Sequence, residues 1–150
     1  MLQDSLLLEK RYKRFIKIVC ESEIVYALKK SNGFATSSSN EFEDENGNPV
    51  GIICFWGEKS RATSCIEKEW SSYKVHEISL PDFLENWCIG MHFDQHIVGT
   101  NFDWNMFGFE IAPLELAVEL IEKIKAKGIK VEFKKYDDIE DFEQRVRSNI

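Results

Sequence analysis

Residues 50–56, VGIICFW, constrain the fold more than any other segment, because they are apolar on both faces of a strand. A strand with one face in water alternates apolar and polar residues, whereas a strand covered on both faces is apolar throughout. The segment is therefore typical of a central, buried strand, and it predicts a sheet with other elements packed against it.

Helical and strand patterns alternate around this segment. Apolar periodicity predicts helices over residues 8–19, 58–73, 81–90, 113–127 and 137–148. Strand patterns cover residues 23–39, 75–80, 96–101, 107–112 and 129–133, with a hairpin turn at Asn32-Gly33. The mixed order predicts one α/β or α+β domain over residues 1–150, with a mixed β-sheet of about six to seven strands and four to five helices packed on it.

Proline and glycine residues mark the expected ends of two helices. Pro81 and Pro113 suit a first helical position, because the missing N–H would have no partner there. Gly90 and Gly128 suit the position that follows the last helical turn. We therefore expect one helix to end at Gly90 and the other at Gly128.

The charge is distributed unevenly along the chain, whose net value is −7. Residues 1–33 carry a net charge of +3, residues 34–110 carry −9 and residues 111–150 carry −1. An acidic middle repels nucleic-acid phosphates and attracts a basic partner. The basic helix face at residues 10–17 has no interleaved exposed aromatics, so we interpret it as a solvated face rather than a nucleic-acid site.

The N-terminus and the cysteines predict a cellular location. The apolar run at residues 6–8 is too short for a signal peptide, and no run approaches the roughly 18–20 apolar residues of a membrane helix. The four cysteines form no CxxC pair. We therefore expect reduced thiols in a cytoplasmic protein with no membrane partner.

Cys88, His92 and His96 are spaced by four residues and form a candidate metal site. Zinc needs about four ligands, and thiolates and imidazoles are the usual ones. No fourth ligand is obvious, although Asp94, Asp103 and Cys65 are candidates, and a helix end at Gly90 would separate the three residues. We favour a buried thiol beside solvated imidazoles, and keep the metal site as a minority hypothesis.

The sequence contains no group of residues typical of catalysis. It has no Gly-x-Ser-x-Gly motif, no phosphate-binding loop and no dinucleotide-binding glycine pattern. The carboxylates of Glu41, Glu43 and Asp44 lie in a polar stretch, where nothing would raise a pKa for acid catalysis. An enzyme is therefore the less favoured class, and no cofactor is predicted.

Four tryptophans lie between residues 56 and 104, in the acidic part of the chain. Trp and Arg are enriched in binding hot spots, and Trp is also a common core residue. We expect Trp70 and Trp87 in the core, and Trp56 and Trp104 near a strand end or loop that a partner could reach. The candidate binding residues are Trp56, Glu58, Arg61, Glu69, Asn101 and Trp104.

Several motifs occur in an order that resembles the bacterial family catalogued as domain of unknown function 2750. They include ICFWGEKSRA, ISLPDFLENW, VGTNFD and PLELAVEL, within residues 11–122. The resemblance assigns family positions to Phe55, Trp56, Arg61, Glu69, Trp70, Trp87, Gly90, Met91, Val98, Gly99 and Asn101. The candidate metal residues are not part of the pattern, and the predicted strand and short helix at residues 129–148 form an extension beyond it. The order of elements also has a weaker architectural likeness to the amino-terminal domains of SseB-type proteins.

The resemblance implies no catalytic mechanism, so the residues themselves decide the leading hypothesis. We expect a non-enzymatic protein-interaction domain of a bacterial cytoplasm, of the kind found in immunity or adaptor proteins, with a protein partner that has a basic surface. The alternative is a small-ligand or metal-binding protein, or an enzyme of unrecognised type. The sequence predicts neither the identity of the partner nor the oligomeric state.

Overall fold

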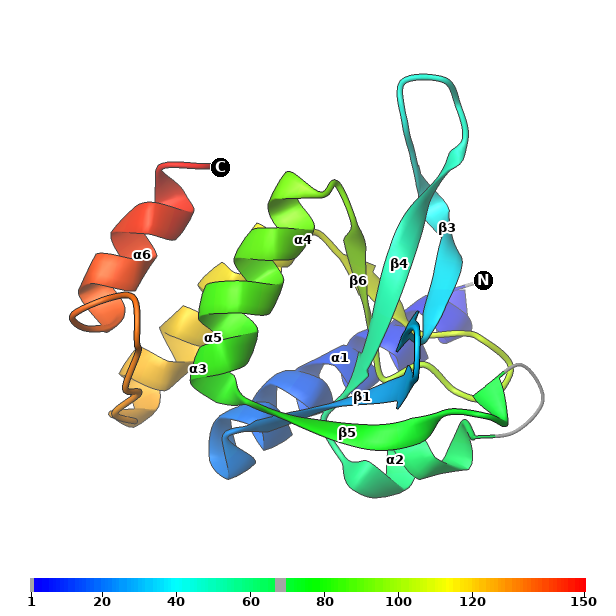
Figure 1. Ribbon diagram of the computed structural model, residues 1–150, viewed down its shortest axis with the longest axis horizontal. Helices are drawn as coiled ribbons and strands as arrows, with labels where there is room; N and C mark the ends of the chain where they lie inside the picture. The colour runs from blue at the N-terminus through cyan, green and yellow to red at the C-terminus, as the bar shows by residue number, and fades with distance from the viewer. Residues whose placement is uncertain (1, 67–69) are drawn as a thin grey trace.

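The computed structural model describes residues 2–66 and 70–150 (Figure 1). Within these residues one sheet holds seven strands. The strands are β1 (Ile24–Lys30), β2 (Gly33–Phe34), β3 (Thr36–Glu43), β4 (Pro49–Trp56), β5 (Lys74–Ser79), β6 (Ile97–Thr100) and β7 (Phe109–Ile111). Because the sheet combines parallel and antiparallel pairs and carries helices, it confirms the predicted α/β or α+β class.

β4 lies at the centre of the sheet, as its apolar sequence predicts. It pairs antiparallel with β1 and β3, and it pairs parallel with β6 from Ile52↔Ile97 to Phe55↔Thr100. β7 pairs with the other edge of β6, and β5 lies along β1 (Figure 1). The parallel register brings the C-terminal ends of β4 and β6 to the same edge of the sheet.

The side chains of β4 alternate between two cores. Phe55 belongs to a cluster on the side of the long helices, which also contains Leu120. Cys54 and Trp56 belong to a second cluster on the opposite face, together with Phe102. A strand whose two faces are both covered needs no polar face, which explains the apolar run at residues 50–56.

The helices lie on both sides of the sheet. α1 and α5 pack against each other, α6 packs on α5 at one end of the molecule, and α2 lies near β5 on the other side (Figure 1). None of the described helices is long and apolar enough to cross a membrane. Their bounds are α1 (Leu2–Ser22), α2 (Lys59–Ser64), α3 (Leu80–Asp82), η2 (Phe83–Cys88), α4 (Ile89–Phe93), α5 (Pro113–Lys127) and α6 (Ile139–Arg147).

The predicted ends of α5 are confirmed. Pro113 is its first residue, and Gly128 follows its last residue with a left-handed φ of 65°. In that conformation the Gly128 N–H reaches the carbonyl groups of Ile124 and Lys125 and closes the helix. Glycine is favoured here because a side chain would be strained at positive φ.

The prediction that Gly90 ends the helix after Pro81 is wrong. α3, η2 and α4 follow one another without a break, and we call them helix 80–93. A glycine inside a helix costs about 1 kcal/mol relative to alanine, which is too little to end a helix with a well-buried face. Phe83, Leu84 and Met91 form that buried face.

The predicted helix over residues 58–73 is shorter than expected, because α2 ends at Ser64. The Ser64 hydroxyl donates to the Arg61 carbonyl oxygen at 2.7 Å, and such local bonds compete with helix continuation. The Cys65 N–H bonds the Ala62 carbonyl oxygen three residues back, which tightens the last turn. Cys65 and Ala62 are nevertheless buried, as the helical pattern predicts.

The predicted strand over residues 129–133 is also wrong, because this segment pairs with no strand in the described part of the chain. Val131 is buried and Phe133 is partly buried in the helix-side cluster, whereas Lys130 and Glu132 are exposed. The alternation therefore reflects packing against helices rather than a place in the sheet. The short helix that follows is confirmed as α6, which buries Phe142 and Val146.

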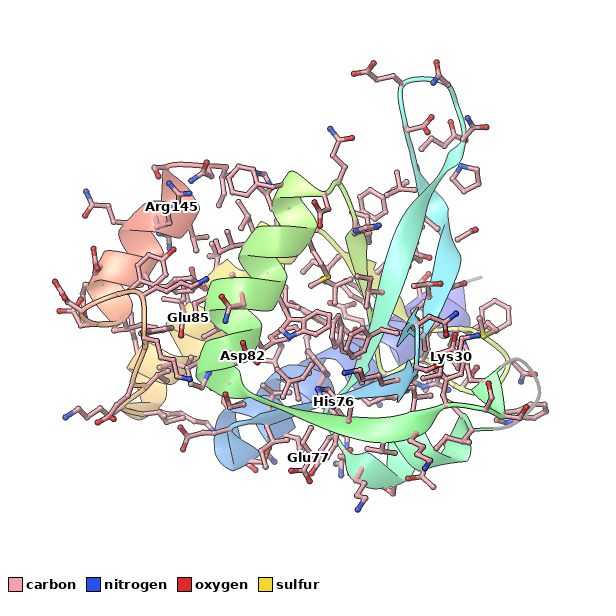
Figure 2. The ribbon with its side chains drawn as sticks, viewed as in Figure 1. Lys30, His76, Glu77, Asp82, Glu85 and Arg145 are labelled. Atoms are coloured by element: carbon pink, nitrogen blue, oxygen red, sulfur yellow. The ribbon has the colours of Figure 1, made fainter. Side chains whose placement is uncertain are left out.

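A buried carboxylate holds this C-terminal segment against helix 80–93. Glu85 is 4% exposed and lies on the side of the helix that faces the segment (Figure 2). Its two oxygens accept hydrogen bonds from the backbone N–H groups of Lys134 and Lys135, at 3.1 and 2.8 Å. Bonds from N–H groups to an ionised carboxylate are stronger than neutral ones, so Glu85 is a structural anchor.

Replacing Glu85 with alanine is expected to destabilise the protein by about 2–3 kcal/mol, because two partly buried N–H groups lose a charged acceptor. Urea denaturation measures this loss, and the amides of Lys134 and Lys135 should exchange faster. Glu132→Ala is the matched control, since that carboxylate is exposed, and its effect should stay within about 0.5 kcal/mol. Equal losses in the two variants would contradict the anchor.

A buried hydrogen bond joins two strands that are not neighbours in the sheet, which indicates that the sheet curls. The Ser39 hydroxyl on β3 donates to the Glu110 carboxylate on β7, although β4 and β6 lie between these strands. Ser39 Oγ also accepts the backbone N–H groups of Glu41 and Phe42, where the register of β3 against β4 shifts. Such an irregularity bends a strand, so β3 turns toward β7.

Candidate functional site

The predicted binding residues gather where β4 and β6 end. Phe55 and Thr100 are paired in the parallel register, so the segments that follow them leave the same edge of the sheet. One segment carries Glu58, and the other carries Asn101 and Trp104. Glu69 lies outside the described residues. The structure therefore brings together residues that are more than 40 positions apart in the sequence.

Asn101 is the junction of this site. It is 2% exposed and has a left-handed φ of 49°, which Asn tolerates better than most residues. Its Oδ1 accepts the Gly57 N–H at 3.1 Å, and its Nδ2 donates to the Arg11 carbonyl oxygen at 3.1 Å. One amide side chain thus joins α1 to the segments after β4 and β6.

The expectation that Trp56 is accessible to a partner is wrong. Its side chain is 0% exposed, and its Nε1 donates to the Phe102 carbonyl oxygen at 2.8 Å. Its ring packs edge-to-face on Trp70, which is buried as predicted, with 5.8 Å between the centroids. Because α2 and the loop after β6 cover the end of β4, the Trp56 side chain lies in the core beneath the site.

Glu58 is held between two arginines. It accepts two hydrogen bonds from Arg14, at 2.7 and 3.1 Å, and one from Arg61 at 3.0 Å. The hydrogen bond from Arg14, and then that from Arg61, holds the pKa of Glu58 below its usual range. A second ion pair joins Arg11 Nη1 to Asp103 Oδ2 at 3.1 Å. The Arg11 pair fixes α1 to the loop after β6, and the Arg14 pair fixes α1 to the start of α2.

The loop at residues 101–108 presents two exposed aromatics. Trp104 is 50% exposed and Phe107 is 58% exposed. Asp103 braces the loop, because its Oδ1 accepts the backbone N–H groups of Asn105 and Phe107 at 2.9 and 3.2 Å. Gly108 is required, since a Cβ there would lie 2.0 Å from the ring of Phe102. We call this loop, with Arg11, Arg14, Glu58 and Arg61, the aromatic corner.

Arg11, Arg14, Asp103 and Phe107 belong to the corner but are absent from the sequence-based set. The two arginines lie three residues apart on one helix face, which the sequence predicts to be solvated. The spacing indicates that the two side chains share a face, but it does not indicate which segment this face contacts. Arg11 bonds Asp103 across 92 positions, and no local pattern predicts such a contact.

The candidate metal residues have different surroundings. Cys88 is fully buried in the helix-side core, and burial raises the pKa of its thiol. His92 and His96 are partly exposed, and the His96 ring lies against Gly51. Within residues 2–66 and 70–150, no three Cys, His, Asp or Glu side chains are placed to hold a metal ion.

The cysteines have the properties of structural thiols. All four are free and buried. Burial raises the pKa of Cys20 to about 11, and it also raises the pKa of Cys54. A thiol is a nucleophile only as thiolate, so these groups stay protonated and unreactive near neutral pH.

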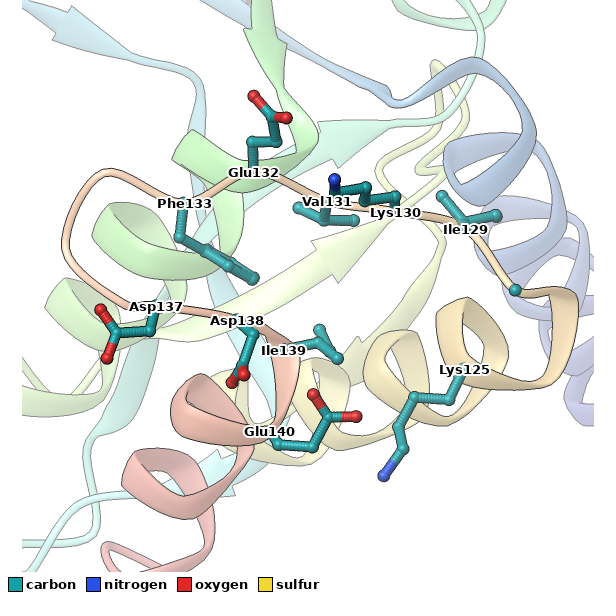
Figure 3. A pocket seen from close by; sticks show the side chains of 11 residues that line it. Lys125, Ile129, Lys130, Val131, Glu132, Phe133, Asp137, Asp138, Ile139 and Glu140 are labelled. Atoms are coloured by element: carbon teal, nitrogen blue, oxygen red, sulfur yellow. The ribbon is translucent and has the colours of Figure 1, made fainter.

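Two hollows lie away from the aromatic corner. A cleft of about 730 Å³ lies between residues 128–133 and the start of α6, with Phe133 and Ile139 among its apolar lining (Figure 3). A smaller cavity of about 250 Å³ lies between β4 and helix 80–93, beside Trp87 and His96. Of the residues proposed as metal ligands, Asp94 and His96 line the smaller cavity.

The fold and the corner define a mixed α/β domain with an exposed aromatic loop braced by ion pairs. Over residues 12–120 the chain matches the family described as protein of unknown function (DUF2750), and it belongs to that family. The match confirms the resemblance seen in the motifs and leaves the C-terminal segment outside. No curated protein and no solved structure matches the chain, so the likeness to SseB-type domains stays a prediction.

Proposed function

We propose that this protein is a non-enzymatic protein-interaction domain that binds its partner through the aromatic corner. The observation that carries the proposal is the exposure of Trp104 and Phe107, at 50% and 58%, on one braced loop. Large apolar side chains rimmed by charged residues are typical of interaction sites, and Trp is enriched in hot spots. Bracing lowers the ordering cost on binding, which favours affinity.

The partner is expected to have a basic surface. Residues 34–110, which contain the loop, carry a net charge of −9. The cations of the corner are largely neutralised, because Arg11 pairs with Asp103 while Arg14 and Arg61 share Glu58. An acidic field steers a basic protein toward the surface and repels nucleic acid. An immunity-type or adaptor role in a bacterial cytoplasm fits this chemistry.

Site-specific cross-linking tests the proposal in the native host. A photo-reactive amino acid is placed at Phe107, and in a second strain at Phe93, which is 57% exposed but lies on α4. We expect one dominant protein to be captured from position 107 and not from position 93. Capture of the same proteins at both positions, or of none at position 107, would overturn the proposal.

With that partner purified, Trp104→Ala is expected to weaken binding at least tenfold, or by about 1.4 kcal/mol, as for a hot-spot residue. The variant should stay folded and be about 1–2 kcal/mol less stable than the wild type, because only the buried half of the side chain contributes to stability. Calorimetric titration measures the affinity, and Phe93→Ala is the matched control. The idea fails if both variants bind as the wild type does.

A further inference from the structure

The cavity between β4 and helix 80–93 has the features of a binding site that is separate from the aromatic corner. Its lining consists of Ile53, Asn86, Trp87, Gly90, Met91, Asp94 and His96. Its volume of about 250 Å³ lies below the range of about 300–1,000 Å³ for drug-sized ligands. It therefore suits a single side chain or a small ion rather than a large cofactor.

Gly90 keeps this cavity open. It lies inside a continuous helix, and its φ is not in the left-handed region. A Cβ at this position would meet no atom within 4 Å, so no close packing requires glycine. Glycine inside a helix is less stable than alanine. Gly90 therefore lowers the stability of the helix, is not required by packing and lines the cavity. This combination points to a ligand that occupies the cavity.

Trp87 forms a fixed aromatic wall of the cavity. It belongs to η2, and π turns occur often at functional sites. Its ring packs edge-to-face against Phe34 and Phe55, with centroids 4.7 and 5.4 Å apart. The indole is thus held in place before any ligand arrives, as a binding platform requires.

The polar groups of the cavity favour a cation. Asp94 supplies a carboxylate, and it caps the C-terminal end of α4, where the helix dipole is negative. The face of an indole also attracts cations. His96 is partly exposed and adds an acceptor when neutral.

We propose that this cavity binds an alkylammonium or guanidinium group, with the cation between the Trp87 ring and the Asp94 carboxylate and the alkyl chain over Gly90. The group belongs to a Lys or Arg side chain of a protein, or to a free amine of the same chemistry. The site does not depend on the aromatic corner.

Titration with defined ligands tests the chemistry. The probes are L-arginine, putrescine, and a short unstructured peptide with one central Arg, and citrulline and a peptide with Gln in place of Arg are the neutral controls. We expect a saturable shift of the Trp87 indole N–H resonance with the cations and none with the neutral controls. Saturation by the Arg peptide alone identifies a protein side chain as the source, whereas saturation by the free cations identifies a small ligand. Equal shifts with citrulline, or no saturable shift with any cation, would overturn the proposal.

Gly90→Ala separates the fold from the site. The variant is expected to raise Tm by roughly 2–4 °C, because alanine favours the helix, and to weaken cation binding at least tenfold, because its methyl group takes the space proposed for the alkyl chain. Asp94→Asn should weaken binding without filling it, and Trp104→Ala should leave it unchanged. Wild-type affinity in both Gly90→Ala and Asp94→Asn would overturn the proposal. The aromatic corner is intact in these two variants, so a failure here would be distinct from a failure of the proposed function.

Discussion

Replacing Trp56 with alanine is expected to destabilise the protein by about 3–5 kcal/mol, the range for truncating a large buried aromatic. The side chain is 0% exposed, packs on Trp70 and donates to the Phe102 carbonyl oxygen. Its removal leaves a cavity between α2 and the sheet, and the Phe102 carbonyl oxygen keeps only the weaker bond from the Cys65 thiol at 3.3 Å. Because domains are typically stable by only about 5–15 kcal/mol, chemical denaturation should show a large loss.

Trp56→Phe is the control that separates packing from hydrogen bonding. It keeps an aromatic ring but removes the Nε1 donor at 2.8 Å from Phe102, so we expect a smaller loss of about 1–3 kcal/mol. If Trp56→Ala lost less than about 1 kcal/mol, the side chain could not be a core residue as described. A binding defect in Trp56→Ala would report a damaged fold, so Trp104 is the better position at which to test a partner.

Replacing Asn101 with alanine is expected to cost about 2–4 kcal/mol. The variant leaves the buried Gly57 N–H unpaired, which costs about 1–3 kcal/mol, whereas the Arg11 carbonyl oxygen keeps its helical bond within α1. The left-handed φ of 49° adds roughly 1 kcal/mol for alanine. Thermal and chemical denaturation measure the total.

Two further substitutions divide this cost. Asn101→Gly accepts the positive φ, so it should be about 1 kcal/mol more stable than Asn101→Ala while lacking the same hydrogen bonds. Asn101→Asp keeps the acceptor for Gly57 and loses the donor to Arg11. If all three variants were as stable as the wild type, Asn101 would not be the junction of α1, β4 and β6.

The sequence predicts those elements whose signals are local. The apolar run at residues 50–56 correctly predicts a central strand, because a strand that is buried on both faces is apolar on both faces. Pro113 and Gly128 correctly mark α5, because each acts through its own backbone. The sequence predicts the hairpin between β1 and β2 but places its turn one residue late, because the turn residues are Ser31 and Asn32 and Gly33 already belongs to β2.

The errors concern contacts between distant segments. Burial of Trp56 depends on Phe102, 46 positions away, and no periodicity records that contact. Residues 129–133 alternate like a strand, but their apolar side chains pack on helices, and only the folded arrangement decides between the two. The sequence predicts a helix end at Gly90, whereas the helix continues because neighbouring residues on its inner face are buried.

The sequence predicts only part of the candidate site, again because the other contacts join distant segments. Glu58, Arg61, Asn101 and Trp104 come from segments that follow parallel neighbours, and the structure brings these segments together. Arg11 of α1 lies about 90 positions from the loop residues that it contacts, and Arg14 lies 44 positions from Glu58. Their role could be found only once the sheet had placed α1 beside the end of β6.

Hydrogen exchange of the complex with the cross-linked partner tests the central claim most directly. We expect binding to slow amide exchange in residues 101–108, with the strongest effect around Trp104 and Phe107, and to leave the hairpin tip between β3 and β4 unchanged. Protection confined to that tip or to α6, with unchanged exchange at residues 101–108, would show that the partner does not bind at the aromatic corner.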